Sequence, residues 1–589
     1  MTAAIQTIWC ELLVATLADA GVATVVVSPG SRSTPLVAAL AGEPRLELVT
    51  IIDERAAAFF ALGIGRATHA PAALVCTSGT AAAHYLPAIV EASLAGVPMI
   101  AITADRPPEL QACGASQTID QIGLYGGFVR GAFDVGAPVG QVHALRALRR
   151  ATIQAITLAR GPHAGPVHLE VPLRKPLEPA APSNEAERGF ARDALALRGP
   201  VDLAPPRLAA APGALRALAA AIAAEPDGVI IAGALPAGFP REHLFSLAAL
   251  AGYPVLAEAG SQLRFGPRPP QVAMIDHADL IPPAQRPAPR LVVQLGSEPV
   301  AASWPPWLAS LTAHRWVLAG ATWADPDASA RGVILGDPGD AVAAIAGLLG
   351  ALDRGTSRIR TAAWLETWRA AEAIAAAASA HAVDSAPRSE VAVLRAALAA
   401  VPAGGTLQIG NSLPIRAVDH LPGGGRPRTV ITQRGAAGID GLIASAAGAT
   451  RGGAPVLLVL GDVSFAHDLG GLLAARCASA PLAILVIDNR GGQIFAGLPV
   501  ARANLGAAFD RHFVTAPELD PSAVASALGA RAMTAVSPAA VGTALETALA
   551  TPGVTVIHAP VSVSGAHDVR RAAIELYAPP HRAARGAIE

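Results

Sequence analysis

Short hydrophobic runs alternate with helical segments through the first 180 residues. The clearest helical segment is ERAAAFFALGIGRAT at 54–68. Runs that are hydrophobic at every position, rather than at every second one, indicate strands buried on both faces of a sheet. A strand–helix–strand order then predicts a parallel, doubly wound sheet. The strands predicted in this part are 23–28, 48–52, 72–77 and 98–103.

The same alternation recurs twice further along. A proline- and alanine-rich stretch at 176–212 is predicted to be a linker, and 360–400 to be a helical connector. The chain of 589 residues is too long for one core. We therefore expect three open, mostly parallel, doubly wound α/β domains, at 1–180, 205–355 and 365–589. The further predicted strands are 228–233, 254–259, 290–296, 315–320, 406–410, 428–432, 455–462, 481–489 and 554–559.

The first 21 residues predict an amphipathic helix. They carry Glu11 and Asp19 and have no basic leader, so a signal peptide is not expected. Hydrophobic runs stay shorter than the ~18–20 uncharged residues of a membrane span, and no membrane span is expected. The residues expected on the apolar side are Ile5, Ile8, Leu12, Leu13 and Leu17.

Charge and cysteine usage narrow the class of protein. The formal net charge is −1, which gives no long-range attraction for nucleic acid. The four cysteines have neither CxxC nor zinc-ligand spacing, which favours a reduced, cytoplasmic protein. Anionic substrates would have to be bound by local arginines.

Polar residues follow two predicted strands of the last block. The strand 455–462 ends on Gly461 and Asp462, and Asn489 ends the next strand 27 residues later. Adjacent parallel strands bring their carboxyl ends to one sheet edge, where ligands bind. A carboxylate and an amide oxygen suit Mg²⁺, and the following glycines let backbone approach a diphosphate. An aspartate after a strand is also a common helix N-cap, but its pairing with Asn489 favours the metal.

This spacing resembles the signature of thiamine-diphosphate enzymes. The resemblance implies that Asp462, Asn489 and the Gly491 carbonyl bind Mg²⁺, or alternatively Mn²⁺. It also assigns the positions of Gly461, Ser464 and Gln493 to the cofactor site.

Glu54 opens the predicted helix 54–68. An acid in the first turn of a helix is stabilised by the helix dipole, which is the simpler explanation. In thiamine enzymes, however, a glutamate at this place contacts the aminopyrimidine ring and is catalytic. The resemblance places it and the metal in different subunits, and therefore implies a homo-oligomer with the site at the subunit interface.

The amino-acid sequences of several motifs further resemble those of the SEPHCHC synthase family of menaquinone biosynthesis. That family decarboxylates 2-oxoglutarate on the cofactor and adds the succinyl carbanion equivalent to isochorismate in a 1,4 manner. The resemblance covers most of both outer blocks. Its motifs are VVVSPGSRSTPL (25–36), DERAAAFFALGIGRAT, CTSGTAAAHYLPAIVEA, TADRPPEL (103–110), SQTIDQ (116–121), GNSLPIR (410–416), QRGAAGIDG (433–441) and GGQIFAGLP (491–499).

Both of these substrates are dianions, and planar guanidinium groups pair well with carboxylates. The resemblance assigns one set of residues to isochorismate and another to 2-oxoglutarate. It also implies that Ile439 bends the cofactor and that three further apolar residues form a dry wall. The isochorismate set is Ser31, Arg32, Arg106 and Gln117; the 2-oxoglutarate set is Ser412, Arg416 and Arg434; the wall is Ile494, Phe495 and Leu498.

The sequence departs from the family at two places. Ala302 and Ser303 stand where a basic residue is common, so a contact to isochorismate would be missing or supplied elsewhere. Asp488 and Arg490 flank Asn489 in place of small polar residues. We expect Asp488 to lie behind the metal ligands.

Two other functions remain open. Another thiamine-dependent 2-oxo acid decarboxylase or carboligase would share Glu54, Asp462 and Asn489, but it would not need four arginines. A non-catalytic protein that kept the fold would need neither the glutamate nor the metal positions.

Overall fold

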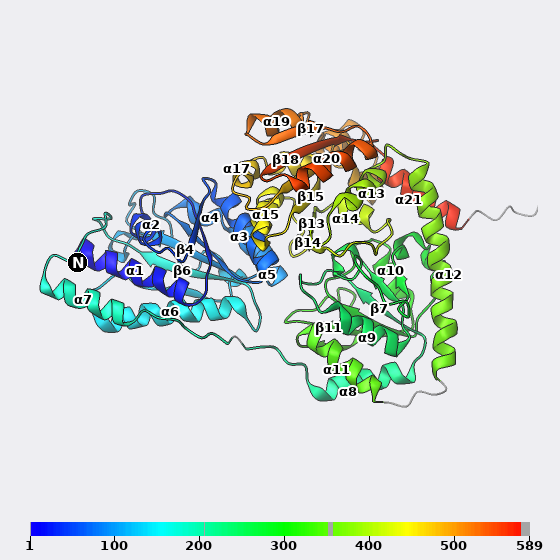
Figure 1. Ribbon diagram of the computed structural model, residues 1–589, viewed down its shortest axis with the longest axis horizontal. Helices are drawn as coiled ribbons and strands as arrows, with labels where there is room; N and C mark the ends of the chain where they lie inside the picture. Colours follow the sequence, from blue (N-terminus) through cyan, green and yellow to red (C-terminus); the bar gives the residue numbers. More distant parts are fainter. Residues whose placement is uncertain (1, 205, 352–356, 579–589) are drawn as a thin grey trace, which may run out of the picture.

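The computed structural model describes residues 2–204, 206–351 and 357–578, without the side chains of 357–361. These residues form three six-stranded sheets (Figure 1). Every strand pair in the described residues is parallel. The expected three-domain α/β fold is confirmed.

The N-terminal sheet has the strand order β2-β1-β3-β4-β6-β5. Its two last strands were not predicted, because polar residues interrupt β6 and β5 is only three residues long. The strands are β1 (Thr24–Val27), β2 (Glu47–Thr50), β3 (Ala72–Cys76), β4 (Met99–Asp105), β5 (Ala132–Asp134) and β6 (Pro166–Pro172). The helices are α1 (Ala3–Asp19), α2 (Thr34–Ala41), α3 (Glu54–Thr68), α4 (Thr80–Ala83), α5 (Leu86–Ala95), α6 (Val142–Arg160) and α7 (Glu185–Ala196).

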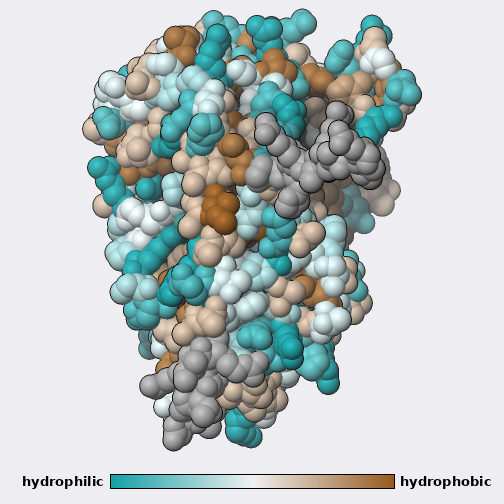
Figure 2. All heavy atoms as spheres, turned by 90° about the vertical axis from the view of Figure 1, so that its right-hand side faces the viewer, coloured by the Kyte–Doolittle hydropathy of each residue, from teal (hydrophilic) through white to brown (hydrophobic). Residues whose placement is uncertain are grey.

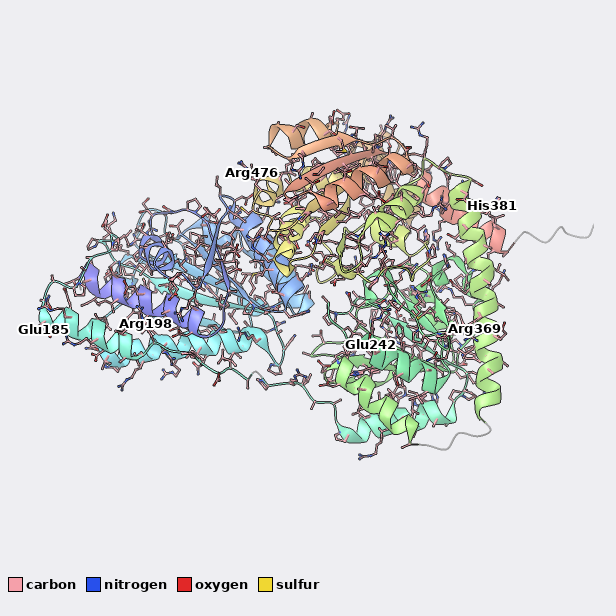
Figure 3. All side chains as sticks on the ribbon, viewed as in Figure 1. Glu185, Arg198, Glu242, Arg369, His381 and Arg476 are labelled. Carbon is pink, nitrogen blue, oxygen red and sulfur yellow. The ribbon has the colours of Figure 1, made fainter. Side chains whose placement is uncertain are left out.

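Helix α7 corrects two predictions. It lies within the predicted linker 176–212, where the Asn184 side chain caps it by accepting a hydrogen bond from the Glu187 N–H. Figure 3 labels Glu185 at its beginning and Arg198 beyond its end. α7 packs against α1, and Arg198 Nη2 lies 3.4 Å from Glu11 Oε2. With α2, α6 and α7 around it, α1 is buried on nearly all sides, so the expectation of an amphipathic helix was wrong.

The middle sheet has the order β9-β8-β7-β10-β11-β12, which is the 3-2-1-4-5-6 arrangement of doubly wound sheets. The predicted boundaries at 205 and 355, and that at 589, lie outside the described residues. The elements are α8 (Pro212–Ala224), β7 (Gly228–Ala232), α9 (Arg241–Ala251), β8 (Val255–Ala257), β9 (Met274–Ile275), β10 (Leu291–Leu295), α10 (Trp304–Ser310), β11 (His314–Ala319), β12 (Ala330–Leu335) and α11 (Pro338–Gly350).

The C-terminal sheet, β14-β13-β15-β16-β18-β17, repeats the strand order of the N-terminal sheet. The long helix α12 reaches it along the edge of the middle sheet (Figure 1). The strands are β13 (Thr406–Ile409), β14 (Thr429–Thr432), β15 (Val456–Gly461), β16 (Leu482–Asp488), β17 (Arg531–Thr534) and β18 (Val554–Pro560). The helices are α12 (Ser357–Asp384), α13 (Glu390–Ala400), α14 (Leu413–Val418), α15 (Leu442–Ala449), α16 (Asp462–His467), α17 (Gly471–Ala475), α18 (Ala507–Phe509), α19 (Pro521–Ala527), α20 (Pro538–Ala550) and α21 (Gly565–Tyr577).

Helices α3 and α15 join the outer sheets through a close crossing. A Cβ atom added at Gly63 would lie 1.9 Å from the Ser445 carbonyl oxygen, and one at Gly448 would lie 1.9 Å from that of Phe60. The two backbones are therefore in contact, and one hydrophobic core runs through both sheets.

The outer face of α12 mixes hydrophilic and hydrophobic atoms. Among the coloured atoms of Figure 2, brown ones are scattered between teal and pale ones, as on ordinary protein surfaces. No helix within the described ranges is both long and apolar enough to cross a bilayer.

The crossing predicts the effect of a small substitution. Gly63→Ala should lower the free energy of unfolding by about 3 kcal/mol, because the added methyl group meets rigid backbone. Gly347→Ala is the matched control: it lies within α11 and its Cβ would have no neighbour within 4 Å. That variant should be neutral or more stable by up to ~1 kcal/mol. Denaturant unfolding measures both, and equal stabilities would contradict the proposed contact.

Candidate active site

The loops after β1, β3 and β4 meet at the carboxyl edge of the N-terminal sheet. Because β1, β3 and β4 are neighbours, these loops lie side by side. The Arg32 N–H donates to the Thr77 hydroxyl at 3.1 Å. A Cβ at Gly30 would lie 2.3 Å from the Thr77 Cβ, so this approach requires glycine.

Arg106 and Gln117 join this edge through Ser78. The Arg106 guanidinium donates to the Ser78 hydroxyl, and the Gln117 amide donates to the Ser78 carbonyl at 3.1 Å. Ser31 is exposed on the loop that carries Arg32. The four residues assigned to isochorismate thus lie on loops of one sheet edge, with three of them around Thr77 and Ser78.

Two positive charges lie close together here. Burial lowers the pKa of Arg32, and the nearby charge of Arg106 lowers it further. One Arg32 nitrogen donates to the Leu173 carbonyl at 2.8 Å, whereas its buried Nε has no hydrogen-bond partner among the residues that the structure describes. Such a pair of guanidinium groups favours a bound anion.

Two buried acids lie behind these arginines. Burial raises the pKa of Asp105 to about 7 and that of Glu170 to about 7. Gln121 links them to the loop, since its amide nitrogen lies 3.2 Å from Glu170 Oε1 and its oxygen accepts the Gly79 N–H at 2.9 Å. Burial lowers the pKa of His168 to about 4, so this histidine adds no positive charge at neutral pH.

A second arginine pair lies at the carboxyl edge of the C-terminal sheet. Arg416 donates to the Ser412 carbonyl at 2.6 Å, and Arg434 donates to Asn411 Oδ1 at 2.9 Å. Burial lowers the pKa of Arg416, and the charge of Arg434 lowers it further. Ser412 has a φ of 72°, a strained backbone conformation of the kind that is common at functional sites. The three residues assigned to 2-oxoglutarate are therefore together.

Asp462 and Gly491 meet at the ends of β15 and β16. The Gly491 N–H donates to Asp462 Oδ2 at 2.6 Å, and burial raises the pKa of Asp462 to about 6. A Cβ at Gly491 would lie 2.3 Å from the Val514 carbonyl oxygen, so only glycine fits. Asn489 donates to Glu390 Oε2 at 3.4 Å, which leaves its amide oxygen for a metal.

This donor set fits a divalent metal. Asp462 lies beside a second acid, Asp488, and that neighbour further raises its pKa. Asp488 also pairs with His558, whose Nε2 lies 2.9 Å from Asp488 Oδ2. That Asp488 lies behind the metal ligands stays a prediction. No cluster of three His, Cys, Asp or Glu side chains suited to a metal occurs in the described parts of the chain. A carboxylate, an amide oxygen and a backbone carbonyl form a set of another kind, which Mg²⁺ accepts.

The segment after Gly491 carries the residues that are predicted to form a dry wall. Gln493–Gly497 is a short 3-10 helix, in which the Gln493 carbonyl accepts a hydrogen bond from His567 at 2.8 Å. Phe495 packs edge-to-face on Phe513, and Leu498 is 40% exposed. Gly461 ends β15, Ser464 is buried in α16, and Ile494 packs against the hydrophobic core of the C-terminal sheet.

Glu54 begins α3, as predicted, and Asp53 caps that helix. Burial raises the pKa of Cys76 and that of Tyr85, and the nearby charge of Glu54 raises both further. Within the described residues, no hydrogen bond or ion pair joins Glu54 or the Arg32 cluster to the Arg416 cluster. Ile52, two residues before Glu54, is 75% exposed.

Several residues that form hydrogen bonds in the candidate site were not predicted from the sequence. Ser78 and Asn411 lie inside quoted motifs, but their role depends on backbone atoms that folding brings to them. Glu170 had one signal, a charge within a hydrophobic run.

The Ser303 hydroxyl accepts a hydrogen bond from Arg286 and donates one to Asp279, each at 2.7 Å. A buried arginine therefore approaches the position where the basic residue of the family is missing.

Solved structures share the overall fold. The crystal structure of benzoylformate decarboxylase from Polynucleobacter necessarius superposes with a TM-score of 0.69 at 16% identity, covering 94% of this chain and 98% of that one. A putative thiamin diphosphate-dependent enzyme from Mycobacterium smegmatis gives 0.67 at 19% identity, covering 93% and 98%.

Family models and curated relatives agree with this architecture. Residues 9–124 match the N-terminal TPP binding domain of thiamine pyrophosphate enzymes, and 416–559 match the C-terminal TPP binding domain. The 2-succinyl-5-enolpyruvyl-6-hydroxy-3-cyclohexene-1-carboxylate synthase of Sorangium cellulosum (strain So ce56) is 40% identical, covering 94% of this chain and 92% of its own. The synthase of the same name from Geobacillus kaustophilus (strain HTA426) is 38% identical, covering 87% of each. The chain therefore belongs to the 2-succinyl-5-enolpyruvyl-6-hydroxy-3-cyclohexene-1-carboxylate (SEPHCHC) synthase family of thiamine pyrophosphate enzymes.

Proposed function

We propose that this protein decarboxylates 2-oxoglutarate and adds the resulting succinyl unit to isochorismate by 1,4-addition. The products are SEPHCHC and CO₂, in menaquinone biosynthesis. The observation that carries the proposal is the presence of two separate arginine pairs, Arg32 with Arg106 and Arg416 with Arg434. Each pair suits a dianion, and the reaction has two dianionic substrates.

Thiamine diphosphate and Mg²⁺, or Mn²⁺, are the proposed cofactors. Asp462, Asn489 and the Gly491 carbonyl would hold the metal. When bound, thiamine diphosphate supplies the electron sink that lets a 2-oxo acid lose CO₂. The residues proposed to line its site are Glu54, Ile439, Gly461, Ser464, Gln493, Ile494, Phe495 and Leu498.

The chain's own residues then orient the substrates. The two arginine pairs hold the carboxylates, while Glu54 holds a proton at its carboxyl group for exchange with the cofactor ring. Ile494, Phe495 and Leu498 exclude water, which strengthens each ion pair.

A homo-oligomer with the site between subunits would bring the two halves together. Ile52 beside Glu54 is 75% exposed, and Leu473, on the adjoining helix α17, is 44% exposed. Large apolar side chains next to a site suit burial by a second copy. We also propose a cytoplasmic location, and small molecules rather than nucleic acid as ligands.

The direct test follows isochorismate absorbance with 2-oxoglutarate, thiamine diphosphate and Mg²⁺, omitting each in turn. A loss of absorbance that requires every component supports the proposal. Release of CO₂ without consumption of isochorismate would point to a different acceptor. If the cofactor is bound but neither loss of absorbance nor release of CO₂ is observed, the proposed function is contradicted.

Glu54→Gln should lower kcat by about 10²–10⁴-fold, because the amide cannot hold the exchanged proton. Thermal unfolding should be unchanged. Glu242→Gln is the matched control, since Glu242 is also a first-turn acid, on the distant helix α9 (Figure 3). Unchanged turnover of the Glu54 variant would remove Glu54 from the mechanism.

Arg416→Ala should raise the KM for 2-oxoglutarate about 30-fold, because it removes a charge-assisted pair worth on the order of 2 kcal/mol. The KM for isochorismate should change by less than about threefold. Arg106→Ala should do the reverse. Initial rates at varied concentrations of each substrate measure both effects, with the exposed Arg192→Ala as control. Parallel changes in both KM values would refute this division of the site.

Asp105 and Glu170 predict a pH dependence. Both have a pKa raised to about 7, so each loses its proton as the pH rises through 7. The added negative charge beside Arg32 and Arg106 should raise the KM for isochorismate about fivefold between pH 6 and 8, on the order of 1 kcal/mol. Glu170→Gln should flatten this profile. An equal rise in the KM for 2-oxoglutarate would assign the effect to another group.

A further inference from the structure

A buried glutamate of the N-terminal domain holds a loop of the C-terminal domain. Glu91 lies on α5 and is 2% exposed. Its Oε1 accepts the Gly435 N–H at 2.9 Å, and its Oε2 accepts the Ala436 N–H at 2.6 Å. One carboxylate thus binds two consecutive backbone N–H groups of a segment more than 340 residues away in sequence.

Arg66 completes this contact. It lies on α3, is 9% exposed and donates to Glu91 Oε1. A Cβ at Gly435 would lie 2.7 Å from the Glu91 carbonyl oxygen, so the loop backbone lies directly on α5. The buried Glu91 carboxylate thus accepts hydrogen bonds from Arg66, Gly435 and Ala436, and a carboxylate at this depth needs such partners.

The held segment carries two residues of the proposed site. Arg434 precedes Gly435, and Ile439 follows shortly after Ala436. On its other side, Asn411 fixes the loop base by donating to the carbonyls of Gln433 (2.8 Å) and Gly438 (2.7 Å). Among the described hydrogen bonds, the stretch between these anchors has only Glu91 as a side-chain partner from the N-terminal domain, and Arg66 in turn donates to Glu91.

We propose that Glu91 is a positioning residue that sets the loop 433–441, and through it the 2-oxoglutarate end of the site. This rests on the proposed function, because Arg434 is assigned to that substrate and Ile439 to the cofactor. Glu91 touches neither, so it acts through the backbone geometry of the loop. A glutamine there presents an NH₂ group to one of the two N–H donors and leaves that donor unpaired.

Glu91→Gln tests the proposal, with Glu187→Gln as matched control. Glu187 also accepts a backbone N–H, from Ser183 at 2.6 Å, but on α7. We expect faster hydrogen exchange in peptides covering 433–441, weaker binding of thiamine diphosphate by calorimetry, and a KM for 2-oxoglutarate raised about tenfold. The KM for isochorismate should stay within twofold, and the control should change none of these quantities.

Other outcomes would overturn the proposal. Unchanged exchange in 433–441, or equal changes in both KM values with a lower Tm, would reduce Glu91 to a stabilising contact. If Glu91→Gln does not fold, Glu91→Asp replaces it. The aspartate keeps the charge opposite Arg66 but is too short to reach both N–H groups, so hydrogen exchange in 433–441 should again be faster than in the wild type. A wild-type protein without turnover would refute the proposed function, whereas hydrogen exchange and cofactor binding would still decide the role of Glu91.

Discussion

The backbone contact between α3 and α15 is the constraint on which the site depends. Helices that touch through glycine have no long side chains to absorb a shift, so the crossing fixes both helices closely. Glu54 begins α3, and the loop 433–441 leads directly into α15. The carboxylate that is proposed to be catalytic and the loop that carries Arg434 are thus both attached to this crossing. Glu91 adds a polar anchor to the same junction.

Much of the fold could be predicted because strands buried on both faces are hydrophobic throughout. The predicted helix 54–68 coincides with α3. Among the elements that were missed, α7 and β6 have tertiary causes. α7 is short and polar on its outer side, and it is stabilised by its cap and by packing on α1. Glu170 interrupts β6, and only the folded structure supplies its partners Thr103 and Gln121.

The roles of the site residues stay a prediction. The motifs pointed to the arginines, Asp462, Asn489 and Glu54, because these stand at strand ends where ligands bind in such sheets. They could not give Asn411, Ser78 or Glu91, which bind backbone atoms of loops that only folding brings near. The meeting of the two halves at a subunit interface stays a proposal, because it would require a surface supplied by another copy.

The charges around the two arginine pairs differ in how much positive charge they leave for anions. The chain is nearly neutral, and acids lie near both pairs: Asp105 near Arg32, and Asp419 near Arg416. An ionised acid neutralises a nearby guanidinium group and competes with the substrate. Burial raises the pKa of Asp105 to about 7, so this carboxyl is partly protonated at neutral pH and opposes Arg32 less than an exposed acid would. Asp419, whose pKa is raised to about 6, is mostly ionised at pH 7 and compensates part of the charge of Arg416. The Arg32 pair therefore keeps more of its positive charge for a dianion than the Arg416 pair does.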